Sequence, residues 1–384
     1  MREVSAAPAA GRAAALVMPG ATLGVLGGGQ LGRFFAIAAR QMGYRVVVLD
    51  PDADSPAGAL ADEHIHAAYD DPAALARMAA VCAAVTTEFE SVPSAAMAYL
   101  AQHCVVAPSA DCVAIAQDRV REKRFLQSNG FAVAPFVVIE SEADLAAAEH
   151  FPAILKVATQ GYDGKGLQAV AGREALREAW LRLGRARCVL EARLPLEREV
   201  SVILARAGSG EVRCFPVAEN RHRGGILDTT LVPATIAPAL AEEARAVAGQ
   251  IAERLGYVGV MAVEFFVSQG RLLVNEIAPR PHNSGHFTLD ACATSQFEQQ
   301  VRALCGLPLG NTDLLAPVVM VNILGEAMLP AAPRWAQLLA LPGVKLHLYG
   351  KREPRPGRKM GHLTVLGEQA AEQAQAYRAE LGID

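Results

Sequence analysis

The chain has 384 residues, of which 52% are hydrophobic and 20% charged, and its formal net charge at pH 7 is -4. This composition excludes a disordered chain, and the lack of an apolar run of bilayer length predicts a protein without a membrane segment. The small net charge favours small-molecule partners over nucleic acid, so we expect any anion to be bound by a local basic cluster.

The cysteines and the N-terminus bear on the compartment. The seven cysteines are odd in number and form no Cys-x-x-Cys pair, which is typical of reduced core thiols in a cytoplasmic protein. Residues 1–19 are rich in alanine and include Arg2 and Arg12. Because their apolar part is dominated by alanine, we interpret them as a disordered extension rather than a targeting peptide.

The first hundred residues alternate between strand and helix patterns. Strands are predicted over 22–26, 45–49, 83–87 and 104–107, and helices from the first strand to Met42 and over 93–102. This alternation predicts an α/β fold with an open, doubly wound parallel sheet.

A glycine fingerprint follows the first predicted strand. The spacing Gly27-x-Gly29-x-x-Gly32, with Asp50 ending the next strand, matches the pattern that places a dinucleotide phosphate at a helix N-terminus. We interpret it as a tight turn into a helix, because an NAD site would leave the second half of the chain unexplained.

Two acidic residues follow the predicted strand 83–87. Glu88 and Glu90 lie just past its carboxyl end, where open α/β sheets place ligand contacts. They are candidate binding residues, and a solvated acidic turn is the alternative interpretation. One helix is then predicted from a cap at Ser109 through Lys123 to a stop at Asn129-Gly130, and the first domain should end there.

A glycine-rich hairpin follows. Residues 151–157 and 167–171 read as its strands, with Lys156 on the first strand and the loop 159–166 between them. Lysine beside a glycine loop suits a triphosphate, because the ammonium neutralises charge and glycine lets backbone N–H groups approach oxygen atoms. A plain surface hairpin is the alternative interpretation.

Two further acids are predicted to share one face of a second hairpin, whose strands and turn cover 259–267, 268–270 and 271–277. If Val267 pairs with Arg271, Glu264 and Glu276 become diagonal neighbours, about 7 to 8 Å apart at their backbones. Magnesium would relieve their repulsion while bridging phosphates. A register slip of one residue would break this argument, and one acid inside with the other at the rim is the alternative.

A basic run near the C-terminus, Lys351 to His362, surrounds residues that favour a rigid turn, Pro354, Pro356 and Gly357. It is similar to a phosphate clamp, and a solvated charged surface is the alternative. The histidines, His64-x-His66 among them, show no spacing typical of zinc.

Taken together, the motifs resemble the 5-(carboxyamino)imidazole ribonucleotide synthases, ATP-grasp enzymes of purine biosynthesis, from about Thr22 to the C-terminus. The motifs that carry the resemblance occur in order at residues 28–33 (GGQLGR), 117–119 (QDR), 161–166 (GYDGKG), 197–201 (EREVS), 275–286 (NEIAPRPHNSGH) and 355–362 (RPGRKMGH).

The resemblance implies a fold of three parts. After the extension 1–19 come an N-terminal Rossmann-like pre-ATP-grasp domain over 20–118, an ATP-grasp domain of two α+β subdomains over 119–310, and a short β-rich C-terminal domain over 311–384. The smaller subdomain, about 119–188, is expected to act as a lid. The resemblance also implies a homodimer in the cytoplasm.

The resemblance implies site residues as well. For ATP these are Arg119, Lys156, Gly161, Tyr162, Asp163, Gly164, Lys165, Gly166, Leu167, Glu191, Ala192, Arg193, Leu194, Glu199, His222, Asn275 and Glu276. The metal ligands are Glu264, Asn275 and Glu276, for Mg²⁺. The ribonucleotide residues are Gln30, Glu88, Tyr162, Asp163, His282, Lys351, Arg358 and Lys359, and the catalytic residues are Lys156, Tyr162, Asp163 and Arg280.

The implied reaction carboxylates the 5-amino group of aminoimidazole ribonucleotide with bicarbonate, while ATP becomes ADP and phosphate. Three alternatives stay open. The first is another ATP-grasp ligase, such as a formate-using glycinamide ribonucleotide transformylase. The second is a nicotinamide-dependent oxidoreductase. The third is a non-catalytic nucleotide sensor or scaffold, which would not need both metal-binding acids.

Overall fold

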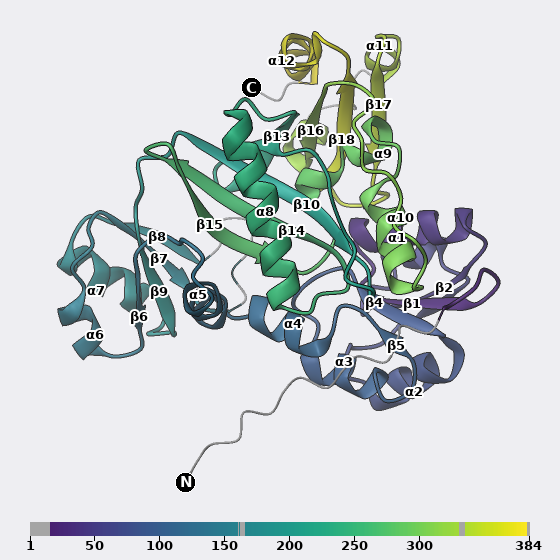
Figure 1. Cartoon of the computed structure of the whole chain (residues 1–384), viewed down its shortest axis with the longest axis horizontal. Coiled ribbons are helices and arrows are strands. Elements are labelled where there is room, and N and C mark those ends of the chain that lie inside the picture. Colours follow the sequence, from purple (N-terminus) through teal and green to yellow (C-terminus); the bar gives the residue numbers. More distant parts are fainter. Residues whose placement is uncertain (1–15, 160, 162–165, 330–334, 382–384) are drawn as a thin grey trace.

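The computed structural model describes residues 16–159, 161, 166–329 and 335–381. The strands of these residues form three sheets, which Figure 1 shows as a purple and blue unit, a small teal unit and a large green to yellow unit. The predicted loop residues Tyr162, Asp163, Gly164 and Lys165 lie outside the described residues. Within the described part of the chain, no helix combines the length and the apolar character needed to cross a bilayer.

The N-terminal sheet is parallel with the order β3-β2-β1-β4-β5. Its elements are β1 (Thr22–Leu26), α1 (Gln30–Gln41), β2 (Arg45–Leu49), η1 (Gly58–Leu60), β3 (Glu63–Ile65), α2 (Pro72–Val81), β4 (Ala84–Thr87), α3 (Ser94–Leu100) and β5 (Val105–Val106). Alternate residues of β2 enter opposite cores: Val46 packs with Phe34 of α1, and Val47 packs with Met78 of α2. The predicted doubly wound sheet is therefore confirmed.

The small sheet is antiparallel with the order β6-β9-β7-β8. Its elements are β6 (Phe136–Ile139), α6 (Glu142–Ala147), β7 (Ala153–Val157), β8 (Leu167–Val170), α7 (Arg173–Arg182) and β9 (Cys188–Ala192). One face packs through Leu155 on Leu176 and Trp180 of α7, and the other packs through Val189 on Val120. The predicted hairpin around Lys156 is confirmed, since β7 and β8 pair directly.

The described strands of the large sheet follow the order β15-β14-β10-β12-β13-β16-β18-β17, with β11 paired to β10. They are β10 (Arg198–Arg206), β11 (Val212–Cys214), β12 (Ala218–Arg223), β13 (Ile226–Val232), β14 (Gly259–Ser268), β15 (Arg271–Ala278), β16 (Val318–Leu324), β17 (Val344–Leu348) and β18 (Lys359–Leu366). The C-terminal strands thus extend the sheet that carries the acidic hairpin. Its helices are α8 (Pro238–Arg254), η2 (Asn283–Gly285), α9 (Thr288–Ala291), α10 (Gln296–Leu304), η3 (Gly325–Met328), α11 (Trp335–Leu339) and α12 (Ala370–Leu381).

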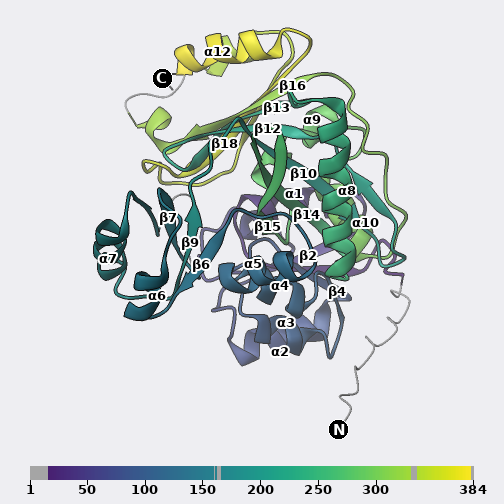
Figure 2. The same ribbon diagram turned by 60° about the vertical axis from the view of Figure 1, so that its left-hand side comes forward.

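The helix predicted from Ser109 to Asn129 is two helices, α4 (Ala110–Ala116) and α5 (Arg119–Ser128). Asp118 ends the first because its carboxylate caps the second, accepting from Val120 N at 2.8 Å and Arg121 N at 3.1 Å. The single-helix prediction was wrong because Asp118 competes for the backbone N–H groups of the next turn. The break lets α5 turn away and lie between β9 and β15 (Figures 1 and 2).

The glycine loop after β1 encloses a carboxylate of its own chain. Glu88 accepts hydrogen bonds from Gly29 N and from Gly32 N at the start of α1. Asp50 accepts from Gly28 N at 2.6 Å. The anion position of the dinucleotide fingerprint is therefore filled by Glu88, which gives the physical reason that this motif serves the fold here.

The structure describes residues 16–19 of the predicted extension 1–19. Val17 is buried, its N–H donates to Cys305 O at 2.9 Å, and its carbonyl accepts from Tyr44 at 2.8 Å. Packing against the first sheet therefore includes Val17, earlier in the chain than we predicted.

Replacing Gly27 should test the enclosure of Glu88. In Gly27→Ala the new methyl group would lie 2.4 Å from Glu88 Cγ and 2.9 Å from the Phe89 ring, at a backbone φ of +109°. Gly130→Ala is the matched control, because Gly130 also has a positive φ but nothing lies within 4 Å of its added methyl group. Denaturant unfolding should show that Gly27→Ala costs about 1 to 3 kcal/mol more than the control. Equal losses would contradict the enclosure.

Candidate active site

Glu264 and Glu276 are directly opposite each other on the hairpin of β14 and β15. Ser268 pairs with Arg271, so the turn is the two-residue Gln269-Gly270, and the predicted three-residue turn was wrong. That register alone would place Glu264 opposite Asn275. A β-bulge between Glu264 and Phe265 shifts the pairing by one residue and returns both acids to one face. The prediction that both acids share one face is therefore confirmed, although they lie directly opposite each other rather than diagonally and the predicted register was wrong.

The two carboxylates have opposite electrostatic environments. Glu264 lies 3.2 Å from His282 Nε2, and burial together with the negative charge of Glu276 raises the pKa of Glu264 to about 7. Burial would also raise the pKa of Glu276, but Arg119, whose Nη1 donates to Glu276 Oε2 at 2.9 Å, holds that pKa below its ordinary value. The pair thus carries less than two full negative charges without a cation.

Helix α5 docks one face onto β15. Arg119, Glu122 and Lys123 stand at the i, i+3, i+4 spacing of one helix face. Arg119 pairs with Glu276, Glu122 accepts from the N–H of Ile277, and Lys123 Nζ donates to Asn275 O at 2.8 Å. Three consecutive residues of β15 are therefore held by one helix.

A buried ion cluster joins α5 to the small sheet. Lys156 Nζ and Lys123 Nζ lie 3.1 Å and 3.3 Å from Glu191 Oε2, and Lys123 is 0% exposed. Burial lowers the pKa of Lys123, with Glu191 opposing that shift. In turn the two lysines outweigh the effect of burial on Glu191 and lower its pKa. Positive charge is thus concentrated beside the acidic hairpin.

Sequence reasoning missed Glu122 and Lys123 as site residues. Their helical spacing from Arg119 is the signal that could have found them. It was unavailable because the prediction of one continuous helix gave no reason to single out the face that begins at Arg119.

The remaining nucleotide candidates lie on the small and large sheets. His222 Nδ1 is 2.8 Å from Glu199 Oε2; burial opposes the charged imidazole, but Glu199 outweighs it and raises the pKa of His222. At the end of β9, Ala192 N donates to Pro135 O, just before β6, and Arg193 N donates to Pro152 O, just before β7. Gly161 is half-buried between β7 and β8, and Gly166 O accepts from Val157 N. Leu167 begins β8, and Leu194 follows Arg193 in the loop before β10.

Of the ribonucleotide candidates, Gln30 and Glu88 follow the carboxyl ends of the N-terminal strands β1 and β4. Arg280 Nε lies 2.5 Å from Glu90 Oε2, so Glu90 is paired rather than solvated, and the positive charge outweighs burial and lowers the pKa of Glu90. Burial raises the pKa of Glu88, while Lys351 opposes that shift. Burial, Arg280 and Lys359 lower the pKa of His282 well below its ordinary value. Gln30 begins α1, and Arg358 donates to Glu353 O at 2.9 Å on an exposed loop.

The donor atoms on the hairpin fit a hard divalent cation. Glu264 and Glu276 supply carboxylate oxygens, and Asn275 Oδ1 is buried with no hydrogen-bond partner among the described residues. Magnesium prefers an all-oxygen set of this kind, completed by substrate phosphates and water. Among the described residues, no three or more His, Cys, Asp or Glu side chains form a group that could hold a metal ion.

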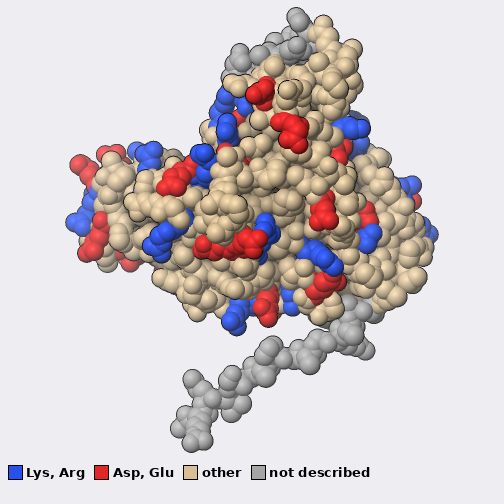
Figure 3. Space-filling model, turned by 45° about the horizontal axis from the view of Figure 1, so that its top comes forward, with Lys and Arg blue, Asp and Glu red and all other residues tan. Residues whose placement is uncertain are grey.

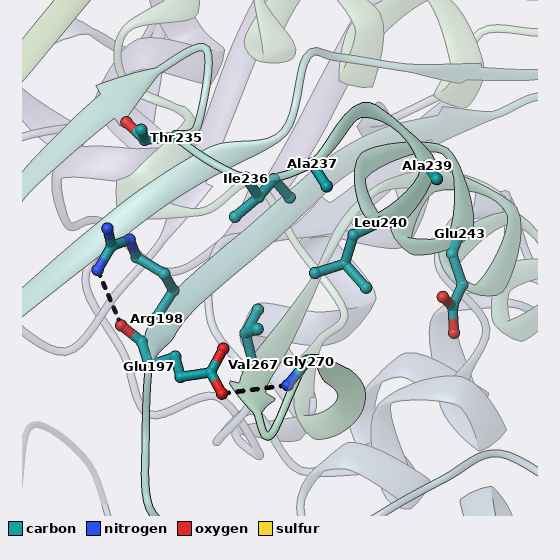
Figure 4. Close-up of a pocket in the computed structure, with 10 residues that line it drawn as sticks. All are labelled: Glu197, Arg198, Thr235, Ile236, Ala237, Ala239, Leu240, Glu243, Val267 and Gly270. Carbon is teal, nitrogen blue, oxygen red and sulfur yellow. Dashed lines mark hydrogen bonds between the residues drawn. The ribbon is translucent and has the colours of Figure 1, made fainter.

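A groove of about 680 Å³ lies away from these residues, at the turn of the hairpin (Figure 4). It is lined by Glu197, Arg198, Thr235, Ile236, Ala237, Ala239, Leu240, Glu243, Val267 and Gly270. Its Glu197 carboxylate already accepts from Gly270 N at 3.1 Å. We place the site instead where Arg119, Glu264 and Glu276 meet, because none of these three residues lines the groove.

On the molecular face shown in Figure 3, basic and acidic side chains are interspersed.

Comparison with known families identifies three segments of the chain. Residues 124–297 match the ATP-grasp domain, residues 20–117 the ribonucleotide synthetase preATP-grasp domain, and residues 318–376 the phosphoribosylaminoimidazole carboxylase C-terminal domain. The N5-carboxyaminoimidazole ribonucleotide synthase of Bacillus subtilis is 43% identical, covering 91% of this chain and 93% of the relative. The chain belongs to the N5-carboxyaminoimidazole ribonucleotide synthase family.

Other members of the synthase family extend the comparison. The synthase of Brucella melitensis is 47% identical over 90% of this chain and 96% of its own length. A crystal structure of a synthase with ADP has a TM-score of 0.91 at 43% identity, covering 96% of this chain and 98% of the other. The Aspergillus clavatus synthase with ADP and 5-aminoimidazole ribonucleotide has a TM-score of 0.86 at 29% identity, covering 94% and 98% of the two chains. The expected family and its three-part fold are confirmed.

Removing the buried lysine should weaken the junction between the sheets. Lys123→Met takes one cation from Glu191 and leaves Asn275 O without its donor, so we expect a loss of about 1 to 3 kcal/mol in the free energy of unfolding. Lys345→Met, at an exposed position on β17, is the matched control and should change stability by less than about 0.5 kcal/mol. A Lys123 variant as stable as this control would show that the cluster does not support the fold.

Glu122 should make stability depend on pH. Burial and the charge of Glu276 raise the pKa of Glu122 from 4.5 to about 8. Folding therefore retains a proton that the unfolded chain releases, and this contribution to stability falls as the pH rises from about 4.5 to about 8. Glu122→Gln mimics the protonated acid, so its unfolding free energy should fall less across that range than that of the unaltered protein. The measurement is urea unfolding at several pH values, with the surface variant Glu372→Gln as a control that should show the pH dependence of the unaltered protein. Equal pH dependence of the unfolding free energy in Glu122→Gln and in the unaltered protein would contradict this prediction.

Proposed function

We propose that this chain carboxylates the 5-amino group of 5-aminoimidazole ribonucleotide with bicarbonate, coupled to conversion of ATP to ADP and phosphate. The observation that carries the proposal is the similarity to synthases over more than 90% of the chain at 43% identity. The charged junction of α5, β9 and β15 lies where such a reaction needs its cations and acids.

The cations beside the hairpin support binding of the nucleotide phosphates. Arg119 and Lys156 already lie on carboxylates, at 2.9 Å from Glu276 and 3.1 Å from Glu191, so each is oriented before a polyanion arrives. Preorganised cations avoid the cost of reorganisation when charge gathers during phosphoryl transfer. The loop that includes Gly161 to Leu167, adjacent to β7 and β8, would cover the phosphates, the segment 191–194 would contact adenine, and Glu199 with His222 would bind near the ribose.

Mg²⁺ would be held by Glu264, Glu276 and Asn275. When bound, it would offset the repulsion between the nucleotide phosphates and an attacking anion. The unpartnered Oδ1 of Asn275 and the adjacent pair of carboxylates support this assignment. Arg119 then has two functions, since it orients Glu276 and adds positive charge on the nucleotide side.

Residues at the ends of the N-terminal strands would bind the second substrate. We propose that Glu88 and Gln30 lie near the aminoimidazole, that Lys351, Arg358 and Lys359 bind its phosphate, and that Arg280 and His282 face bicarbonate. The pair of Arg280 with Glu90 supports this, because it fixes the guanidinium between the N-terminal sheet and the hairpin.

The proposed reaction must activate bicarbonate, because bicarbonate is a poor electrophile. A bicarbonate oxygen attacks the γ-phosphorus of ATP, the bond to ADP breaks, and carboxyphosphate forms. The amine nitrogen then forms a bond to the carbonyl carbon, directly or after release of carbon dioxide, while phosphate leaves and the amine loses a proton. The protein's part is to bring the charged reactants together, exclude water and offset their negative charge.

The alternatives receive less support. A formate-using transformylase shares the ATP-grasp domain, but the C-terminal domain matched at 318–376 is that of phosphoribosylaminoimidazole carboxylase. The hypothesis of a nicotinamide-dependent oxidoreductase is disfavoured because the Glu88 carboxylate occupies the position where the glycine loop would bind a dinucleotide phosphate. A homodimer in the cytoplasm, with no nucleic acid or membrane partner, is the setting we propose from the resemblance.

The direct test is ADP release by the purified protein with ATP, magnesium and bicarbonate, with and without 5-aminoimidazole ribonucleotide. We expect release that depends on the ribonucleotide and equals its loss. Glu276→Gln should lower this rate by about a hundredfold or more, because an interaction with developing charge is lost. Glu372→Gln, at an exposed position, is the control for removing one negative charge. ADP release that does not depend on the ribonucleotide would contradict the proposed substrate. A Glu276→Gln variant that keeps most of its rate would contradict the proposed role of Glu276 in holding the metal.

A further inference from the structure

A chain of buried hydrogen bonds leads across the large sheet to His282. Thr230 Oγ1 donates to Asn220 Oδ1 at 3.0 Å, and Asn220 Nδ2 donates to Ser201 Oγ at 2.9 Å. Ser201 Oγ lies 2.8 Å from Ser284 Oγ, which lies 2.8 Å from His282 Nδ1. The four residues Thr230, Asn220, Ser201 and Ser284 are called the His282 chain below.

The sheet register explains why these residues meet. Ser201 of β10 is directly opposite Glu264 of β14, so the two side chains share a face with Glu276. Asn220 of β12 is directly opposite Thr230 of β13, and both lie on the same face of the sheet as Ser201. The His282 chain therefore lies on the same face of the sheet as the two acids.

A backbone group sets the direction of the hydrogen bonds. The N–H of Ser284 points at His282 Nδ1 at 3.3 Å, and a backbone N–H cannot act as an acceptor. This long contact favours a lone pair on Nδ1, and the shorter hydrogen bond reinforces that preference when the Ser284 hydroxyl donates to Nδ1 and accepts from Ser201. Ser201 in turn accepts from Asn220, which accepts from Thr230, and every member of the chain has a consistent role.

Burial makes this direction difficult to reverse. Thr230, Ser201 and Ser284 are 0% exposed, and Asn220 is 4% exposed. Reversing one bond would leave a buried donor facing a donor, at a cost of about 1 to 3 kcal/mol. The backbone of His282 is fixed as well, because Gln296 Oε1 accepts from its N–H at 2.9 Å and Gln296 Nε2 donates to its carbonyl at 2.8 Å.

We propose that the His282 chain acts as a set of positioning residues that hold His282 in the tautomer protonated at Nε2, so that Nε2–H donates to Glu264 Oε1. Nε2 lies 3.2 Å from that oxygen. His282 then orients the Glu264 carboxylate as a hydrogen-bond donor and has no lone pair at Nε2 with which to act as a base. The effect on turnover rests on the proposed function, whereas the tautomer itself does not.

The first test is the ¹⁵N spectrum of full-length protein labelled in histidine, with the His282 signals identified by their loss in His282→Gln. We expect Nδ1 to show the shift of an unprotonated nitrogen and Nε2 that of a protonated one. In Ser284→Ala, which removes the hydroxyl donor at 2.8 Å and leaves only the longer contact of the backbone N–H at 3.3 Å, a mixture of both tautomers should appear. In Thr230→Val, which keeps the shape of the side chain, a smaller change in the same direction is expected.

The second test separates positioning from stability. Ser284→Ala should lower kcat by about tenfold and change the KM for ATP much less, as expected for loss of a group behind a ligand-binding carboxylate. The matched control is Thr364→Val, because Thr364 is also buried in this sheet and its hydroxyl has no partner among the described residues. This control should leave both kcat and the tautomer unchanged.

Two results would overturn the proposal: His282 protonated at Nδ1 in the unaltered protein, or a tautomer that does not change in either chain variant. If Ser284→Ala did not fold, Thr230→Val would decide between these results. A protein that shows the expected tautomer but no ADP release dependent on the ribonucleotide would contradict the proposed function while leaving the role of the His282 chain in place.

Discussion

The site depends on holding two carboxylates side by side on adjacent strands. Glu264 and Glu276 are opposite each other in the hairpin of β14 and β15, and like charges in that position repel. The structure limits the repulsion by giving each acid its own partner. Arg119 stabilises the charge of Glu276, while burial and the negative charge of Glu276 raise the pKa of Glu264, whose carboxylate lies beside His282. A divalent cation would complete this arrangement by replacing the proton on Glu264.

Helix α5 converts this local pair into a junction between the sheets. Its capping residue Asp118 sets the start of the helix, and the spacing of Arg119, Glu122 and Lys123 then places all three against β15. Lys123 also reaches Glu191 of the small sheet, which holds Lys156 from β7. A shift of α5 would therefore move the acids proposed to bind the metal and the lysine proposed to bind phosphate together, which is consistent with the burial of so many ions at this point.

Much of the fold followed from the sequence, because its strands are short apolar runs with clear glycine turns. The doubly wound sheet and both hairpins were correctly predicted for this reason. Two local errors had physical causes. The cap at Asp118 was missed because helix patterns on both sides of it are continuous. The hairpin register was wrong because the turn is one residue shorter than predicted and because a bulge leaves no simple mark in the sequence.

The site was predictable where residues act in pairs along one element and less so where they meet across the fold. Glu264 and Glu276 were related by strand periodicity, because the predicted turn was one residue too long and this compensated for the unpredicted bulge. Lys123 with Glu191, and Ser201 with Ser284, are brought together only by packing between distant segments. Glu88 illustrates the same limit: its place past a strand end was evident, but not that it would fill the phosphate position of the glycine loop.

The most direct test of the account is whether the acidic hairpin binds a divalent cation together with nucleotide. Mn²⁺ can be titrated into the protein in the presence of ADP and followed by electron paramagnetic resonance. The account predicts tight binding that weakens by at least about tenfold in Glu264→Gln and does not change in Glu372→Gln. Equal Mn²⁺ affinity in the Glu264 variant and the unaltered protein would contradict it, because the paired carboxylates would then have no part in holding the cation.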